Sequence, residues 1–141
     1  MSFSELISPL IGRALLAWFF LSSAFDYAGR WHATITMMAM QGAPAPALLL
    51  AIGIIVMLIG GISLLFGFHA RYGALLLFSF TLLASIMMHD YWHIKDAVAR
   101  AADYEIFVRN MAIAGALLFM AGVGSGPFSI DNRLNAPKKK R

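Results

Sequence analysis

The stretch from Met111 to Val123 contains no polar side chain, so a helix formed there has no face suited to water. A helix that is apolar on every side needs an apolar surround. Each run of this kind in the chain is long enough to cross roughly 30 Å of hydrocarbon, which takes about 20 helical residues. Four such runs are predicted, at about residues 10–28, 47–68, 72–93 and 104–123. The sequence therefore predicts an all-α fold, a four-helix transmembrane bundle.

The composition supports one membrane-embedded domain that spans residues 1–141. Hydrophobic residues make up 60% of the chain and charged residues 13%, which is too little polar surface for a soluble fold. The lipid bilayer is therefore the expected surround. The absence of cysteine excludes disulfide exchange, thiolate metal sites and cysteine nucleophiles. Basic residues concentrate in the tail rather than in a basic and aromatic patch, so we expect no nucleic-acid binding.

The distribution of lysine and arginine predicts the orientation of the bundle. Four crossings place both termini on one side of the membrane. That side carries Arg13, Arg71, Arg133 and the tail residues Lys138, Lys139, Lys140 and Arg141, whereas the other side carries Arg30, Lys95, Arg100 and Arg109. The positive-inside rule then places both termini, and the basic tail 132–141, in the cytoplasm. A bacterial inner membrane is the expected location.

Glycines recur at heptad spacing in two of the four runs. Gly53, Gly60 and Gly67 fall on one stripe of the second helix, and Gly115 and Gly122 repeat the device in the fourth. Small residues on one stripe let a neighbouring helix approach closely in lipid. We expect both stripes at helix–helix contacts, and a homo-oligomer would use such stripes equally well.

Polar residues continue the helical spacing beyond Met88. His89, His93, Asp96, Arg100 and Asp103 would share one face, which predicts a helical outer extension between the third and fourth helices. Asp103 then resembles an N-cap, with Glu105 in the first turn of the fourth helix. In the first loop, a patch with Met37, Met38 and Met40 predicts a short interfacial helix that Gly and Pro residues end.

Four patterns, in order along the chain, resemble those of the DoxX family of small four-helix membrane proteins. They are Gly12-Arg13 with its following Leu residues, Gly60-Gly61 with Gly67 and Arg71, His89 with Trp92, and Arg109-Asn110 with Gly124, Gly126, Ser129 and Asp131. Two positions depart from the family's pattern. Met57 stands where many relatives carry a glutamate, and Asp26-Tyr27 stands where a lysine is common.

The resemblance implies a membrane partner of redox enzymes, since the family's name comes from a subunit of a quinone-reducing thiosulfate oxidoreductase. We therefore expect an accessory subunit of a quinone-linked membrane redox system. No motif for a flavin, haem or iron–sulfur centre is present, so a redox partner protein would supply the electrons. Whether the chain is itself an enzyme stays open.

The candidate ligand site lies at the outer ends of the third and fourth helices. His89 and Asn110 would donate to the carbonyls of a quinone, and Trp92 or Tyr91 would lie against its ring. His93 and Ser85 are further candidate ligand-binding residues. The structural alternative is that His89 bonds Ser85 or a neighbouring helix and joins the bundle. His89 and His93 at i, i+4 also have the spacing that begins many metal sites, but the sequence fixes no third ligand and we predict no metal.

Two structural ion pairs are predicted at helix ends. Arg13 and Asp131 lie on the side of the termini, and their pairing would join the C-terminal segment to the first helix. Asp26 and Arg109 lie on the other side and would pair in the same way.

Two alternatives to the redox role come from other classes of protein. A small-molecule transporter or channel-like oligomer would use a polar path along Thr81, Ser85 and His89, which step by four on one face. A non-catalytic membrane scaffold would need none of these side chains for chemistry.

Overall fold

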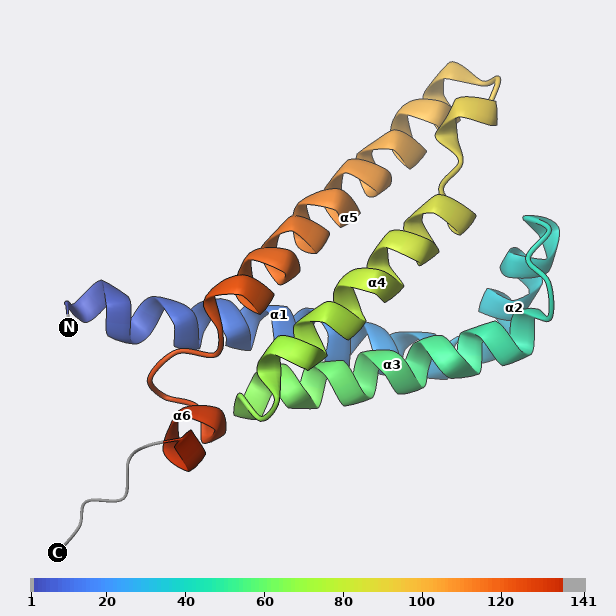
Figure 1. Cartoon of the computed structure of the whole chain (residues 1–141). Helices are drawn as coiled ribbons and strands as arrows, with labels where there is room; N and C mark the ends of the chain where they lie inside the picture. Colours follow the sequence, from blue (N-terminus) through green and yellow to red (C-terminus); the bar gives the residue numbers. More distant parts are fainter. Residues whose placement is uncertain (1, 136–141) are drawn as a thin grey trace, which may run out of the picture.

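The computed structural model describes residues 2–135, and in this part of the chain every regular element is helical (Figure 1). The elements are α1 (Phe3–Gly29), α2 (Trp31–Met40), α3 (Pro46–Phe66), α4 (Ala70–Met88), the short 3₁₀ helix η1 (Tyr91–His93), α5 (Ala97–Val123) and α6 (Ile130–Asn135). Four of them, α1, α3, α4 and α5, are long and apolar enough to cross a membrane. The predicted helical bundle with four spans is confirmed.

The four long helices pack in a chain of neighbours. α1 packs on α3, α3 on α4, and α4 on α5. In Figure 1, α1 and α3 lie alongside each other, and α4 and α5 cross them obliquely. We call the end at which α1 starts and α6 lies the terminal end (residues 3–13, 64–74 and 124–135). The opposite end, formed by residues 26–44 and 86–103, is the histidine end.

The helix boundaries follow capping signals that differ in part from the predicted ranges. α1 begins at Phe3 rather than near residue 10, because Ser2 and Glu5 form a capping box, with the Ser2 amide donating to Glu5 Oε2 at 2.8 Å. Pro46 opens α3 at its first turn, where the missing N–H costs nothing. The methionine-rich patch forms α2, as the sequence predicts, and Gly42 follows it with a positive φ.

The predicted extension of the third helix is interrupted. α4 ends at Met88, and a break with the single turn η1 separates it from α5. Asp96, not Asp103, is the N-cap of α5, since its carboxylate accepts the Ala99 amide at 2.8 Å. Asp103 therefore lies inside α5, and the helical extension at this end belongs to the start of α5 rather than to α4.

The glycine stripe of α3 lies at two interfaces, as predicted. A Cβ on Gly60 would overlap the Leu77 side chain of α4, and a Cβ on Gly61 would lie 2.8 Å from Leu21 of α1. α3 thus approaches both neighbours through adjacent glycines. Leu64 of α3, Leu77 of α4 and Leu117 of α5 are completely buried in the core that results.

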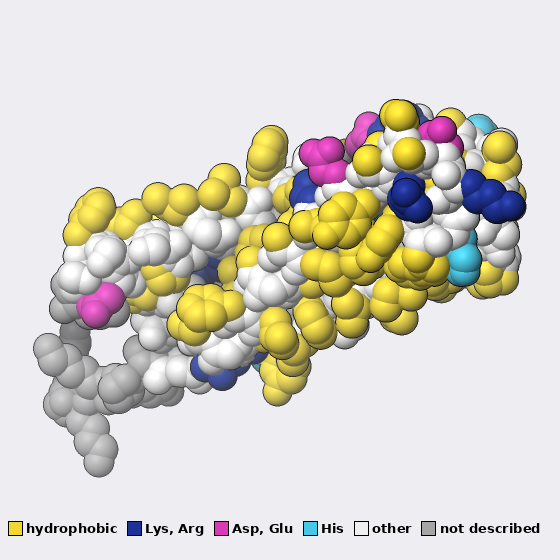
Figure 2. All heavy atoms as spheres, turned by 90° about the horizontal axis from the view of Figure 1, so that it is seen from above, with side chains coloured by type: hydrophobic (Ala, Val, Ile, Leu, Met, Phe, Trp, Pro, Cys, Tyr) yellow, Lys and Arg dark blue, Asp and Glu magenta, His cyan; other side chains and the backbone are white. Residues whose placement is uncertain are grey.

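The prediction for the second stripe is wrong within the single chain. Around Gly115 and around Gly122 nothing lies within 4 Å of an added Cβ. The reason is the order of packing, because α5 meets the bundle through α4 on its other face. Large hydrophobic side chains are exposed along all four long helices, among them Trp18 (69%) and Phe119 (72%), as expected for lipid-facing surfaces. In Figure 2, charged and histidine side chains gather at the histidine end, with hydrophobic side chains along the length of the molecule.

Replacement by alanine should have opposite effects at a glycine packed against another helix and at one that faces open space. Gly60→Ala should lower the thermal unfolding midpoint in detergent, because the new methyl overlaps Leu77 and overpacking costs about 1–3 kcal/mol. Gly115→Ala is the matched control, since its methyl meets open space and alanine favours a helix by about 1 kcal/mol. An equal loss of stability in both variants would contradict the α3–α4 contact.

Candidate functional site

The terminal end is organised around the buried guanidinium of Arg13. This side chain is 2% exposed, and it donates to the carbonyl oxygens of Ser125 and Phe128, at 2.7 Å each. The predicted ion pair between Arg13 and Asp131 is not formed. The guanidinium instead satisfies carbonyl groups of the irregular segment that follows α5, which have no helical partner. The predicted structural role, joining the C-terminal segment to α1, is therefore achieved through backbone groups.

Asp131 joins the same segment to the start of α4. Its two carboxylate oxygens accept the amides of His69 and Ala70, at 2.7 and 3.0 Å, and its own amide donates to the Gly67 carbonyl at 2.9 Å. The carboxylate therefore caps α4, although it stands 61 residues further along the chain. Both oxygens of Asp131 thus bind backbone amides and make no ion pair with Arg13, although the negative charge of the carboxylate still acts on that guanidinium.

Gly67 makes this junction sterically possible. Its φ is +64°, in the left-handed region, and an added Cβ would lie 2.5 Å from both Arg13 Nη1 and Ser129 Cβ. Ser129 is itself buried and donates to the Gly126 carbonyl at 2.7 Å. Arg13, Gly67 and Asp131, which belong to three different sequence patterns, thus meet at one packed junction. Its contacts are structural.

The histidine end holds a paired histidine and carboxylate. Nδ1 of His89 lies 2.7 Å from Oδ1 of Asp103, and the two side chains are 23% and 17% exposed. The pair joins the end of α4 to the second turn of α5. Of the two structural partners predicted for His89, Ser85 or a neighbouring helix, the structure shows the neighbouring helix. Asp103 was missed as a partner because the sequence pattern reads equally well as an N-cap.

Four aromatic residues that follow His89 or Asp103 closely in the chain form a cluster at the histidine end. Tyr91 contacts the rings of Trp92, Tyr104 and Phe107 at centroid distances of 5.1, 5.0 and 5.3 Å. Trp92 also meets Phe107 edge-on at 6.1 Å. These rings come from η1 and α5, on the two sides of the loop that holds Asp96. The cluster therefore spans the break between α4 and α5.

The remaining predicted ligand residues differ in position. His93 is not on one helical face with His89, because α4 has ended. It is 75% exposed and lies 3.1 Å from Asp90. Ser85 is completely buried one turn below His89, and its hydroxyl has no hydrogen-bond partner in residues 2–135. Asn110 is half-buried on α5, seven residues beyond Asp103 and therefore on the same helical face.

The second predicted ion pair is wrong. Asp26 pairs with Arg30 one turn along the chain, and this contact raises the pKa of the Arg30 guanidinium. Arg109 lies on α5, whose neighbour is α4 rather than α1. Asp26 has a local partner within reach, so no long-range contact is needed. Within the described residues, no group of three or more His, Asp or Glu side chains is placed to hold a metal ion. The basic residues 138–141 lie outside the described residues.

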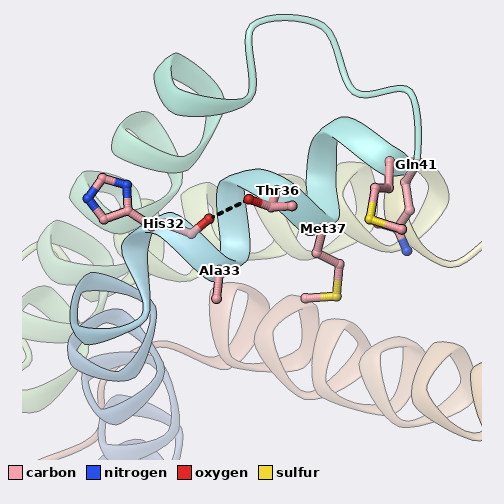
Figure 3. Close-up of a pocket in the computed structure, with 6 residues that line it drawn as sticks. His32, Ala33, Thr36, Met37 and Gln41 are labelled. Atoms are coloured by element: carbon pink, nitrogen blue, oxygen red, sulfur yellow. Dashed lines mark hydrogen bonds between the residues drawn. The ribbon is translucent and has the colours of Figure 1, made fainter.

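A cavity of about 720 Å³ lies along α2, lined by His32, Ala33, Thr36, Met37, Met40 and Gln41 (Figure 3). In this view the His32 ring points away from the Met37 side chain. The hydroxyl of Thr36 donates to the His32 carbonyl at 2.9 Å and is thereby satisfied within the helix. Gln41 reaches the Met88 carbonyl at 3.3 Å. Polar groups do not converge on this cavity, so it resembles an interfacial helix surface rather than a ligand site.

Known proteins resemble the chain over most of its length. The DoxX family model matches residues 8–90. Inner membrane protein YphA of Escherichia coli K12 is 33% identical over 125 residues, which cover 88% of this chain and 88% of that protein. Inner membrane protein YqjF of the same organism is 30% identical over 135 residues, 93% and 95% of the two chains.

A more distant similarity reaches a eukaryotic protein. The ER-derived vesicles protein ERV29 of Saccharomyces cerevisiae is 25% identical over 80 residues, which cover 57% of this chain and 26% of that protein. No solved structure matches the chain.

The Arg13 contacts predict that replacing this side chain exposes the C-terminal segment to protease. In Arg13→Gln, trypsin should cleave after Arg133 at least roughly tenfold faster in detergent, because two charge-assisted hydrogen bonds worth about 1.5–3 kcal/mol each are lost. Mass spectrometry of the fragments measures this cleavage. Arg30→Gln is the control, since it removes an exposed arginine at the histidine end. Equal cleavage rates in the two variants would show that Arg13 does not hold the segment.

Proposed function

The chain belongs to the DoxX family of integral membrane proteins, and from this premise we propose that it is an accessory subunit of a quinone-linked redox system. The observation that carries the proposal is the 2.7 Å contact between His89 and Asp103. It lies near the end of two helices that are long and apolar enough to span a membrane, where a lipid-soluble molecule and water would both have access. The similarity to two inner membrane proteins supports a location in a bacterial inner membrane.

The carboxylate of Asp103 would set the state of the His89 ring. With Nδ1–H donating to Asp103, the opposite nitrogen Nε2 is left to accept a proton from a quinol hydroxyl or, once protonated, to donate to a quinone carbonyl. The electrons would pass to or from a partner protein, since the chain's sequence carries no motif for a redox centre.

The surrounding groups suit an aromatic ligand. Trp92 and Phe107 would offer aromatic surface to a quinone ring, and stacked aromatic pairs contribute about 0.5–1.5 kcal/mol each. Asn110 lies on the Asp103 face of α5, further into the membrane, and would offer a second donor. The ring would enter from the bilayer beside α4 and α5.

Two buried hydroxyl groups of α4 support the transport alternative. Thr81 and Ser85 are 6% and 0% exposed, and neither hydroxyl has a partner among residues 2–135. Buried hydroxyls of this kind are normally satisfied by backbone or by water. Solute flux into liposomes that Ser85→Val abolishes would favour transport over the redox role.

The redox proposal predicts that removal of the His89 imidazole abolishes quinone binding. Native mass spectrometry of protein extracted with its own lipids should detect bound quinone in the wild type and none in His89→Ala, because the ligand's polar contact is gone. His93→Ala is the matched control, since this side chain is 75% exposed and stands four residues after His89 in the chain. Asp103→Asn should weaken binding severalfold while preserving the shape of the site.

Each contrary result has a distinct meaning. Quinone retained by His89→Ala would place the ligand elsewhere and leave His89 a structural residue. If neither the wild type nor the variants carry quinone, and a double replacement of His89 and His93 leaves every phenotype intact, the scaffold alternative would replace the redox role.

A further inference from the structure

A second cavity, of about 740 Å³, lies at the terminal end between α3 and α4. Its lining is almost entirely apolar and comes from α3, the α3–α4 connection, α4 and α6. The residues are Ile59, Ile62, Ser63, Phe66, Phe68, His69, Tyr72, Gly73, Leu76 and Ile130. We call it the α3–α4 groove. Its volume falls within the roughly 300–1,000 Å³ of small-molecule sites.

The groove follows from the glycine contact between the two helices. Gly73 of α4 lies against Ser63 of α3, where a Cβ would overlap the serine side chain. The backbones therefore approach closely there, and the larger side chains beside the contact stand outward. Ile62 is 49% exposed and Tyr72 is 72% exposed. From Ile59 to Phe66, α3 rises about 10 Å, which lies within one leaflet of a roughly 30 Å hydrocarbon core.

The mouth of the groove carries two polar groups on a fixed backbone. His69 adopts a φ of +49° and its amide donates to Asp131 at 2.7 Å, so the packed junction holds its backbone. The ring meets Phe68 edge-on at 4.4 Å and lies 6.0 Å from Tyr72. No hydrogen bond among residues 2–135 occupies the imidazole or the Tyr72 hydroxyl.

The charge around this mouth favours an anion. Arg133 stands three residues after Ile130 on α6 and is exposed, so it lies on the side of α6 that faces the groove. The negative charges of the terminal end are those of Glu5, which caps the start of α1, and Asp131, whose two oxygens accept backbone amides. Among the described residues of this end, Arg13, Arg71 and Arg133 outnumber them. Arginine beside an apolar slot between membrane helices is the arrangement that recognises anionic lipid headgroups.

We propose that the α3–α4 groove binds one acyl chain of an anionic phospholipid, with its phosphate at His69, Tyr72 and Arg133. The lipid belongs to the leaflet at the terminal end. It covers the apolar side chains that the close approach of α3 and α4 leaves outward, and it braces the junction that Asp131 and Arg13 hold. This site lies at the opposite end from His89 and does not depend on the redox role.

The test is native mass spectrometry of delipidated protein to which phosphatidylglycerol or phosphatidylcholine with identical acyl chains is added. One phosphatidylglycerol should be retained in preference. Ile62→Trp should abolish this retention by filling the slot, whereas Ile55→Trp, on the same stripe of α3 and similarly exposed, should leave it unchanged. Arg133→Gln should reduce the preference about fivefold, and Arg100→Gln should not.

Three results would overturn the proposal. Equal retention of the two lipids would mean a non-specific lipid shell. Loss of the bound lipid in both tryptophan variants would place it elsewhere on α3. Retention of added ubiquinone in the groove, with displacement of phosphatidylglycerol and sensitivity to Ile62→Trp, would identify a quinone slot instead. His69→Asn removes the ring without straining the backbone, because asparagine tolerates a positive φ. Its lipid binding therefore distinguishes loss of the ring from loss of the fold.

Discussion

The close approach of α3 to two neighbours at once supports the rest of this structure. Gly60 faces α4 and Gly61 faces α1, so consecutive residues remove the side chains that would otherwise hold both helices apart. In lipid, helices gain little from burying apolar surface, and close van der Waals contact takes its place. α3 thereby becomes the central element, and α5 reaches the bundle through α4. This order of packing explains why the α5 glycines face open space and why Arg109 does not meet Asp26.

The two ends of the bundle use polar groups in different ways. At the terminal end, the buried Arg13 donates to backbone carbonyls and the half-buried Asp131 accepts backbone amides, and both satisfy groups that lack a helical partner. At the histidine end, His89 and Asp103 are partly exposed and bind each other through Nδ1 of the ring. The patterns shared with the DoxX family thus divide into a structural set and a candidate chemical set.

Sequence reasoning succeeded where the signal was local. The four apolar runs, the α3 glycine stripe and the methionine-rich helix α2 all depend on spacing along one element. It failed where several partners fitted one residue. Asp103 had the features of an N-cap, yet Asp96 was a better one because the break after Met88 let α5 start earlier. When polar residues continue the helical spacing, the spacing does not show where the helix ends.

The sequence by itself determined that this chain is a membrane protein with four spans, because hydrophobic length and composition act residue by residue. It also determined which faces carry glycine or polar groups, since the helical repeat fixes them. Only the tertiary structure decided partners: Arg13 with carbonyls 112 and 115 residues away, Asp131 with the start of α4, and His89 with Asp103. These choices depend on how helices cross and on which backbone groups remain unsatisfied, and both are properties of the assembled fold.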